Sequence, residues 1–191
     1  MDIQAYLPSG EQGILPYYLF IVSFHAPPAV PASNGSQVGA VAVGNSLQNL
    51  VTLHYTRRIY NGVFVPNAAL SRTSASADFN PDDSVSKLVP ASSTGKDVEK
   101  ARDQVTPLAA RLFGVWTLMN GLIRLYTAYE VHSRALYHLS VLTHVAALTH
   151  FTSELLVYRT MRLTGPQFFP LLAGWGGAIW MILQYGHYVS K

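Results

Sequence analysis

The sequence predicts an all-α, multi-pass membrane protein: a four-transmembrane-helix bundle with a long disordered loop between the first and second spans. Three observations predict this class. Charged residues make up 12% of the 191 residues, whereas they make up about 25% of soluble globular proteins. The mean hydropathy is +0.19 although the chain contains a long polar segment. The apolar residues also gather in stretches close to the roughly 20 helical residues that a bilayer core requires.

The first span is expected over residues 14–55, interrupted by an insert at 24–39. The apolar run before the insert is too short to cross a bilayer alone. The insert itself contains several Pro, Gly and Ser residues, which predict a loop. Hydrophobic residues then resume around a polar centre that includes Asn45 and Gln48. Amide groups inside a span predict hydrogen bonds between helices, with a ligand site as the alternative.

The remaining chain divides into one polar segment and three apolar ones. Residues 61–106 are rich in Ser, Ala, Asp, Pro and Lys, a composition that predicts a flexible loop because it buries little apolar surface. Three further spans are expected at 109–131, 135–158 and 168–189. The single membrane domain therefore covers residues 1–191.

Small residues mark expected contacts between these helices. In the last span, Ala173 with Gly177, and Gly174 with Ala178, form two small-xxx-small pairs. Such pairs let membrane helices approach closely. The sequence therefore predicts a tightly packed face on the last span.

Basic residues predict the orientation in the membrane. Arg57 and Arg58 precede the long loop, and Arg159 and Arg162 lie in the loop before the last span. Cytoplasmic loops carry an excess of Lys and Arg, so both loops are expected in the cytosol. The net charge of +3 is thus interpreted as a topology signal, and no nucleic-acid partner is expected.

Four histidines, His132, His138, His144 and His150, recur with a six-residue spacing that resembles a metal-binding array. On a helix, six residues turn the chain by about 600°, so the imidazoles scatter around the axis. This geometry argues against one metal site and favours neutral histidines bonded to neighbouring helices. The chain has no cysteine, which also excludes thiolate metal ligands, disulfides and a cysteine nucleophile.

His150 and Glu154 share a helix face because they are four residues apart. They could form a proton-transfer pair or a structural pair. Arg124 in the preceding span is a candidate partner for Glu154, although antiparallel helices would place the two at different depths. No phosphate loop, GxSxG, HExxH or GxGxxG motif occurs. The sequence therefore predicts neither a catalytic set nor a cofactor.

Several short blocks, taken together and in order, resemble the ergosterol biosynthetic protein 28 family. They are VGNSLQ at 43–48, LHYTRR at 53–58, RLFGVWT at 111–117, IRLY at 123–126 and HFTSELLVY at 150–158. The resemblance implies a small multi-pass protein of the endoplasmic reticulum membrane. It also implies that the protein is not an enzyme and acts as a scaffold in sterol synthesis.

The resemblance also implies partners. These are the sterol C-4 methyl oxidase, the 3β-hydroxysteroid dehydrogenase/decarboxylase, the 3-keto sterol reductase and the sterol C-24 methyltransferase. Self-association into a homo-oligomer is left open. Under this interpretation five residues are helix–helix or partner contacts: Asn45, Gln48, Arg124, His150 and Glu154. The alternative is a membrane sterol-binding protein or a sterol-modifying enzyme that uses Glu154 and His150.

The chain departs from the family pattern in two places. In the family, the apolar segment before residue 24 runs directly into the one after residue 39, forming one span. We therefore hypothesise that residues 24–39 are encoded by a retained intron. The long loop at 61–106 is the second departure, and it is interpreted as specific to this lineage.

Overall fold

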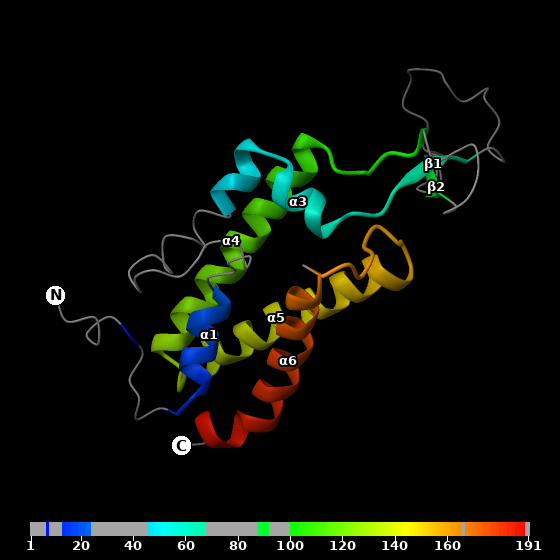
Figure 1. Cartoon of the computed structure of the whole chain (residues 1–191). Helices are drawn as coiled ribbons and strands as arrows, with labels where there is room; N and C mark the ends of the chain where they lie inside the picture. The colour runs from blue at the N-terminus through cyan, green and yellow to red at the C-terminus, as the bar shows by residue number, and fades with distance from the viewer. Residues whose placement is uncertain are drawn as a thin grey trace, which may run out of the picture.

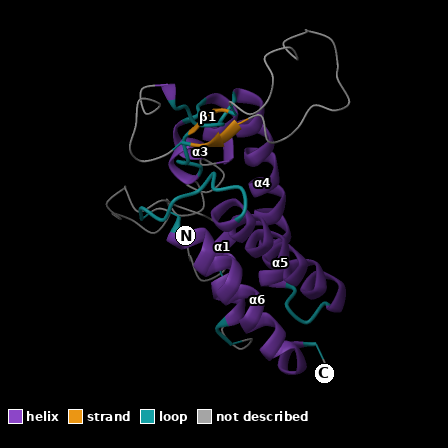
Figure 2. Ribbon diagram, turned by 90° about the vertical axis from the view of Figure 1, so that its right-hand side faces the viewer, coloured by secondary structure: helices purple, strands orange, loops and turns teal. Residues whose placement is uncertain are grey.

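The computed structural model describes residues 7, 13–23, 46–67, 88–91, 100–165 and 167–189. Its elements are α1 (Leu15–Ser23), α3 (His54–Ile59), β1 (Phe64–Pro66), β2 (Leu88–Pro90), α4 (Pro107–Tyr129), α5 (Arg134–Leu156) and α6 (Phe168–Tyr188) (Figure 1). Residues 46–51 are also helical. Helices make up nearly all of this secondary structure (Figure 2), as the predicted fold class requires.

The three long helices form the body of the protein. Thr106 caps the start of α4, where its hydroxyl accepts a hydrogen bond from the Ala109 amide at 3.1 Å and Pro107 occupies the first turn. Both features favour a helix start because they satisfy or remove free amide groups. Helices α4 and α5 each contain 23 residues, which corresponds to about 35 Å. Within the described part of the chain, α6 alone is both long and apolar enough to qualify as a membrane span.

The two described pieces of the expected first span lie one after the other along α4. Leu15 and Leu19 of α1 pack against Ala128 near the end of α4. The Ser46 hydroxyl lies 3.4 Å from the Thr117 hydroxyl, nearer the start of α4. The chain therefore runs antiparallel to α4 in both pieces (Figure 1). The insert between them and Asn45 fall outside the described residues.

A small antiparallel sheet lies within the segment 61–106, for which the sequence predicts a flexible loop. Phe64 pairs with Pro90, and Pro66 pairs with Leu88. The Phe64 amide also donates to the Arg102 carbonyl at 2.8 Å, which brings the end of the expected loop against its start. Phe and Val favour strands. Composition averaged over the whole segment concealed these short apolar triplets.

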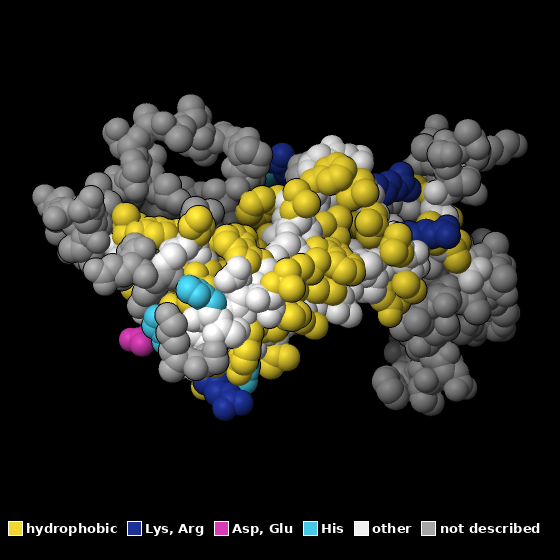
Figure 3. All heavy atoms as spheres, turned by 90° about the horizontal axis from the view of Figure 1, so that it is seen from below, with side chains coloured by type: hydrophobic (Ala, Val, Ile, Leu, Met, Phe, Trp, Pro, Cys, Tyr) yellow, Lys and Arg dark blue, Asp and Glu magenta, His cyan; other side chains and the backbone are white. Residues whose placement is uncertain are grey.

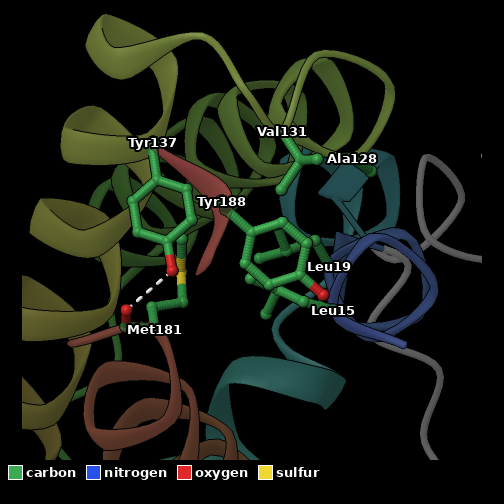
Figure 4. Close-up of a cluster of buried hydrophobic side chains, with 7 residues drawn as sticks. All are labelled: Leu15, Leu19, Ala128, Val131, Tyr137, Met181 and Tyr188. Carbon is green, nitrogen blue, oxygen red and sulfur yellow. Dashed lines mark hydrogen bonds between the residues drawn. The ribbon is translucent and has the colours of Figure 1, made fainter. Parts of the chain in front are cut away.

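Two clusters of buried side chains hold the helices together. The first joins Leu15 and Leu19 of α1 to Val131, Tyr137 and Met181 (Figure 4). The Tyr137 hydroxyl donates to the Met181 carbonyl at 2.6 Å, a bond between α5 and α6. The second cluster lies toward the opposite ends of α4 and α5 and consists of Ile59, Phe113, Ala147, Phe151 and Met161.

Many apolar side chains lie on the surface of the molecule, as one face shows (Figure 3). Exposed large apolar residues recur along α4 at steps of three and four residues: Leu108, Leu112, Val115, Met119, Leu122, Tyr126 and Tyr129. A similar stripe follows α6: Phe168, Leu172, Trp175, Ile179 and Ile182. Steps of three and four place each set on one helix face. These stripes form an unusual surface for a protein in water.

Candidate functional site

A cavity of about 490 Å³ opens between α4, α5 and the chain that follows α3. This volume falls within the range of small-molecule sites, about 300–1,000 Å³. Its lining residues are Thr56, Tyr60, Gly62, Gln104, Val105, Ala109, Leu112, Phe113, Trp116, Ala146, His150, Glu154 and Thr160. Most of the wall is apolar and aromatic, and the polar groups include a connected set.

That set, the polar corner, consists of Tyr60, His150, Glu154 and Thr160. The Tyr60 hydroxyl lies 2.6 Å from Nε2 of His150. The Thr160 hydroxyl donates to Oε2 of Glu154. Oε1 of Glu154 lies 3.8 Å from Nδ1 of His150. A chain of polar contacts therefore runs from Tyr60 to Thr160 along one side of the cavity.

Local structure positions these four side chains. His150 and Glu154 are one helical turn apart on α5, so they face the same way. After α5 the chain reverses at Arg159, which has a positive φ of 59°. The Gly62 amide then donates to the Thr160 carbonyl at 2.8 Å. A β-carbon at Gly62 would collide with the backbone of Arg159 and Thr160. Glycine thus permits the close approach that holds Tyr60 beside His150.

Burial and the charge of Glu154 both keep the Tyr60 hydroxyl protonated. Burial raises the pKa of the Tyr60 hydroxyl, and the nearby Glu154 carboxylate raises this pKa further. Tyr60 therefore keeps its proton, and its hydroxyl either donates to Nε2 of His150 or accepts from it, depending on the imidazole tautomer. In a neutral imidazole with Nε2 as acceptor, Nδ1 carries the hydrogen. That N–H then lies on the side of the ring nearer Glu154.

Arg124 lies elsewhere and does not contact Glu154. Its Nε donates to the Thr143 hydroxyl at 3.1 Å, and Nη2 donates to the Thr143 carbonyl at 3.3 Å. Helices α4 and α5 are antiparallel, so a residue late in α4 meets the first half of α5. Glu154 near the end of α5 lies beyond its reach. Arg124 is 4% exposed and links two helices inside the bundle.

Of the two amides predicted to make contacts in the first span, the structure describes Gln48. Gln48 is half-buried, and its carbonyl accepts a bond from the Thr52 amide at 2.7 Å. Gln48 is not among the residues that line the cavity. Asn45 falls outside the described residues, so its role stays a prediction.

The four spaced histidines contact different neighbours. Nδ1 of His132 lies 2.8 Å from the Tyr188 carbonyl, and Nε2 of His138 lies 2.9 Å from the Tyr185 hydroxyl. Nδ1 of His144 lies 2.9 Å from the carbonyl of Ser140 within its own helix. In the described ranges, no three residues among His, Cys, Asp and Glu gather as metal ligands would.

Sequence reasoning missed Tyr60, Thr160 and Trp116 as parts of the cavity. Trp116 packs edge-on against His150 with ring centroids 5.4 Å apart. Tyr60 and His150 are 90 residues apart in the chain, so no local spacing links them. The hydrogen-bonded approach of two loops, which only the fold reveals, brings them together.

Comparisons with known proteins identify the family. The model of the Erg28 like protein family matches residues 36–179, which include the whole polar corner. The chain belongs to the Erg28 family. It is 41% identical over 188 residues to ergosterol biosynthetic protein 28 of Gibberella zeae, covering 98% of this chain and 97% of that relative. No solved structure matches the chain.

More distant members of the Erg28 family align as well. The protein of the same name from Candida albicans is 27% identical over 187 residues, or 98% of this chain and 96% of that relative. The human ergosterol biosynthetic protein 28 homolog is 43% identical over 68 residues, or 36% of this chain and 49% of that relative. Membership implies a role in ergosterol biosynthesis.

Proposed function

We propose that this protein is a non-catalytic scaffold that tethers the enzymes of sterol C-4 demethylation in the endoplasmic reticulum membrane. The partners are the C-4 methyl oxidase, the 3β-hydroxysteroid dehydrogenase/decarboxylase, the 3-keto reductase and, in addition, the sterol C-24 methyltransferase. The observation that carries this proposal is the similarity to ergosterol biosynthetic protein 28 over 98% of the chain.

The scaffold crosses the membrane four times. The apolar stripes on α4 and α6 support this arrangement, because a contiguous apolar surface of this kind suits lipid or another membrane helix. The burial of Arg124 against α5 supports it too, since a cation at membrane depth is stable when it faces protein. The first and third loops, with their arginines, lie in the cytosol.

Deletion of the gene tests the role in sterol synthesis. Cells that lack a tether should accumulate 4-methyl or 4-carboxy sterol intermediates, because the product of one enzyme leaves before the next enzyme receives it. Re-expression of the full chain should restore the sterol profile, which gas chromatography with mass spectrometry measures. A deletion strain with an unchanged sterol profile would overturn the proposal.

The polar corner favours a second candidate function, a sterol-modifying enzyme that uses Glu154 and His150. Glu154→Gln separates the two candidates because it keeps the size of the side chain and removes its charge. If the variant loses sterol conversion while every partner still co-purifies and sterol still binds, Glu154 acts in chemistry. If it keeps conversion, or loses both conversion and partners, the scaffold proposal stands. Glu130→Gln, at an exposed residue outside the cavity lining, is the control for the same change of charge.

A further inference from the structure

The walls of the cavity suit a rigid apolar ligand. Phe113 and Trp116 from α4 lie with ring centroids 5.8 Å apart, and Leu112 and Ala146 extend the apolar wall. Aromatic faces bury large areas and pack well against flat groups. Leu112 is 63% exposed and belongs to the apolar stripe of α4. The cavity therefore borders the surface that we assign to lipid, which gives a lipid molecule a direct route of entry.

The polar corner suits one neutral hydroxyl group. Oε2 of Glu154 accepts the Thr160 hydroxyl. Oε1 lies 3.8 Å from Nδ1 of His150, which is longer than a hydrogen bond. A carboxylate accepts several hydrogen bonds, so Oε1 has acceptor capacity for a donor in the cavity. The same carboxylate would repel a fatty acid or a phosphate, so the corner disfavours anionic lipids.

We propose that this cavity binds one sterol molecule, with its hydroxyl group donating to Oε1 of Glu154 and its ring system against Phe113 and Trp116. The choice of a sterol among neutral lipid alcohols rests in part on the proposed function, because the scaffold works beside enzymes that handle sterols. The scaffold therefore also holds a sterol at the cytosolic end of α4 and α5, where its partners would collect it.

Photolabelling of the full-length protein in lipid nanodiscs tests the proposal. The probe is a 3-hydroxysterol that carries a diazirine on its ring system, and the comparison probe is a fatty acid with the same diazirine. We expect the sterol probe to label peptides that contain 104–116 or 146–154, and an excess of unlabelled 3-hydroxysterol to remove the label. The 3-methoxy ether should compete about tenfold less well, the effect expected for one hydrogen bond to a charged acceptor.

Variants test the position of the site. Ala146→Phe fills the cavity and should reduce labelling at least fivefold, whereas Leu142→Phe, at a 61% exposed position on the same helix, should leave labelling unchanged. Glu154→Gln should remove the preference for the hydroxysterol over its ether. If Ala146→Phe fails to fold, the comparison of the 3-hydroxysterol with its 3-methoxy ether as competitors in the unmodified protein tests the proposal.

Three results would overturn the proposal: equal labelling by the fatty acid probe, equal competition by the ether in the unmodified protein, or undiminished labelling in folded Ala146→Phe. Co-purification of the sterol enzymes from the same preparations is measured in parallel. If the sterol probe does not label the protein but the sterol enzymes still co-purify, only the proposed sterol site is refuted. If the sterol probe labels the protein but the sterol enzymes do not co-purify, only the scaffold proposal is refuted.

Discussion

Gly177 of α6 has no room for a side chain where α6 meets α5 and α1, and its substitution by alanine should destabilise the bundle. A β-carbon there would overlap the imidazole of His144 and the hydroxyl of Tyr18. That hydroxyl donates to the Ala173 carbonyl at 2.8 Å, so one added methyl group disturbs two neighbours and a hydrogen bond. Gly176 is a matched control, because a β-carbon there meets no atom within 4 Å.

The expected change in the free energy of unfolding follows from three contributions. Alanine in place of glycine favours either helix position by about 1 kcal/mol. At Gly177 overpacking opposes this by about 1–3 kcal/mol, and loss of the Tyr18 bond adds about 1 kcal/mol. Gly177→Ala should therefore lower the free energy of unfolding by about 1–3 kcal/mol, whereas Gly176→Ala should raise it by up to about 1 kcal/mol.

Denaturation with sodium dodecyl sulfate in mixed micelles measures the free energy of unfolding for both variants against the unmodified protein. Intrinsic fluorescence reports the transition, since Trp175 and Trp180 flank the substituted positions. The two variants should differ by about 1–4 kcal/mol, and Gly177→Ala should be the less stable of the two. Equal stability of the two variants would refute the packing of α6 against α1 and α5 described above.

Three further predictions concern other parts of the chain. In a double-mutant cycle, Arg124→Met and Thr143→Val should show a coupling free energy of about 1 kcal/mol in the same assay; additive effects would contradict the bond. Since the chain lacks cysteine, an impermeant maleimide should label Leu163→Cys in sealed microsomes, but Ser133→Cys only after permeabilisation. The reverse pattern would invert the topology. Sequencing of the transcript should reveal a message without residues 24–39, and exclusive recovery of the longer message would reject the intron hypothesis.

Helical structure was predictable because each later apolar segment is about as long as a membrane-spanning helix, and Pro107 and Pro170 lie in the first turns of their helices, where proline is tolerated. Helices α4, α5 and α6 coincide with three of those segments. The pairing of β1 with β2 was not predictable from average composition, because two triplets contribute little to the mean of a long polar segment. Strand pairing depends on contacts between distant residues, which a window average does not detect.

The candidate site was predictable only in part. The i, i+4 spacing placed His150 and Glu154 together, and the antiparallel arrangement of neighbouring helices argued against a contact between Glu154 and Arg124. Tyr60 and Thr160 left no local signal. Tyr60 lies in the segment before α4, and Thr160 lies in the segment after α5. The hydrogen bond from the Gly62 amide to the Thr160 carbonyl joins these two segments.

Tethering is the central claim, and one measurement tests it directly. The C-4 methyl oxidase is purified in mild detergent by an affinity tag from cells with and without this protein, and quantitative mass spectrometry measures the dehydrogenase/decarboxylase and the 3-keto reductase that accompany it. Our account predicts that both enzymes co-purify when the protein is present and are largely lost when it is absent, with unchanged expression of all three. Equal recovery of the enzymes in the two strains would contradict it.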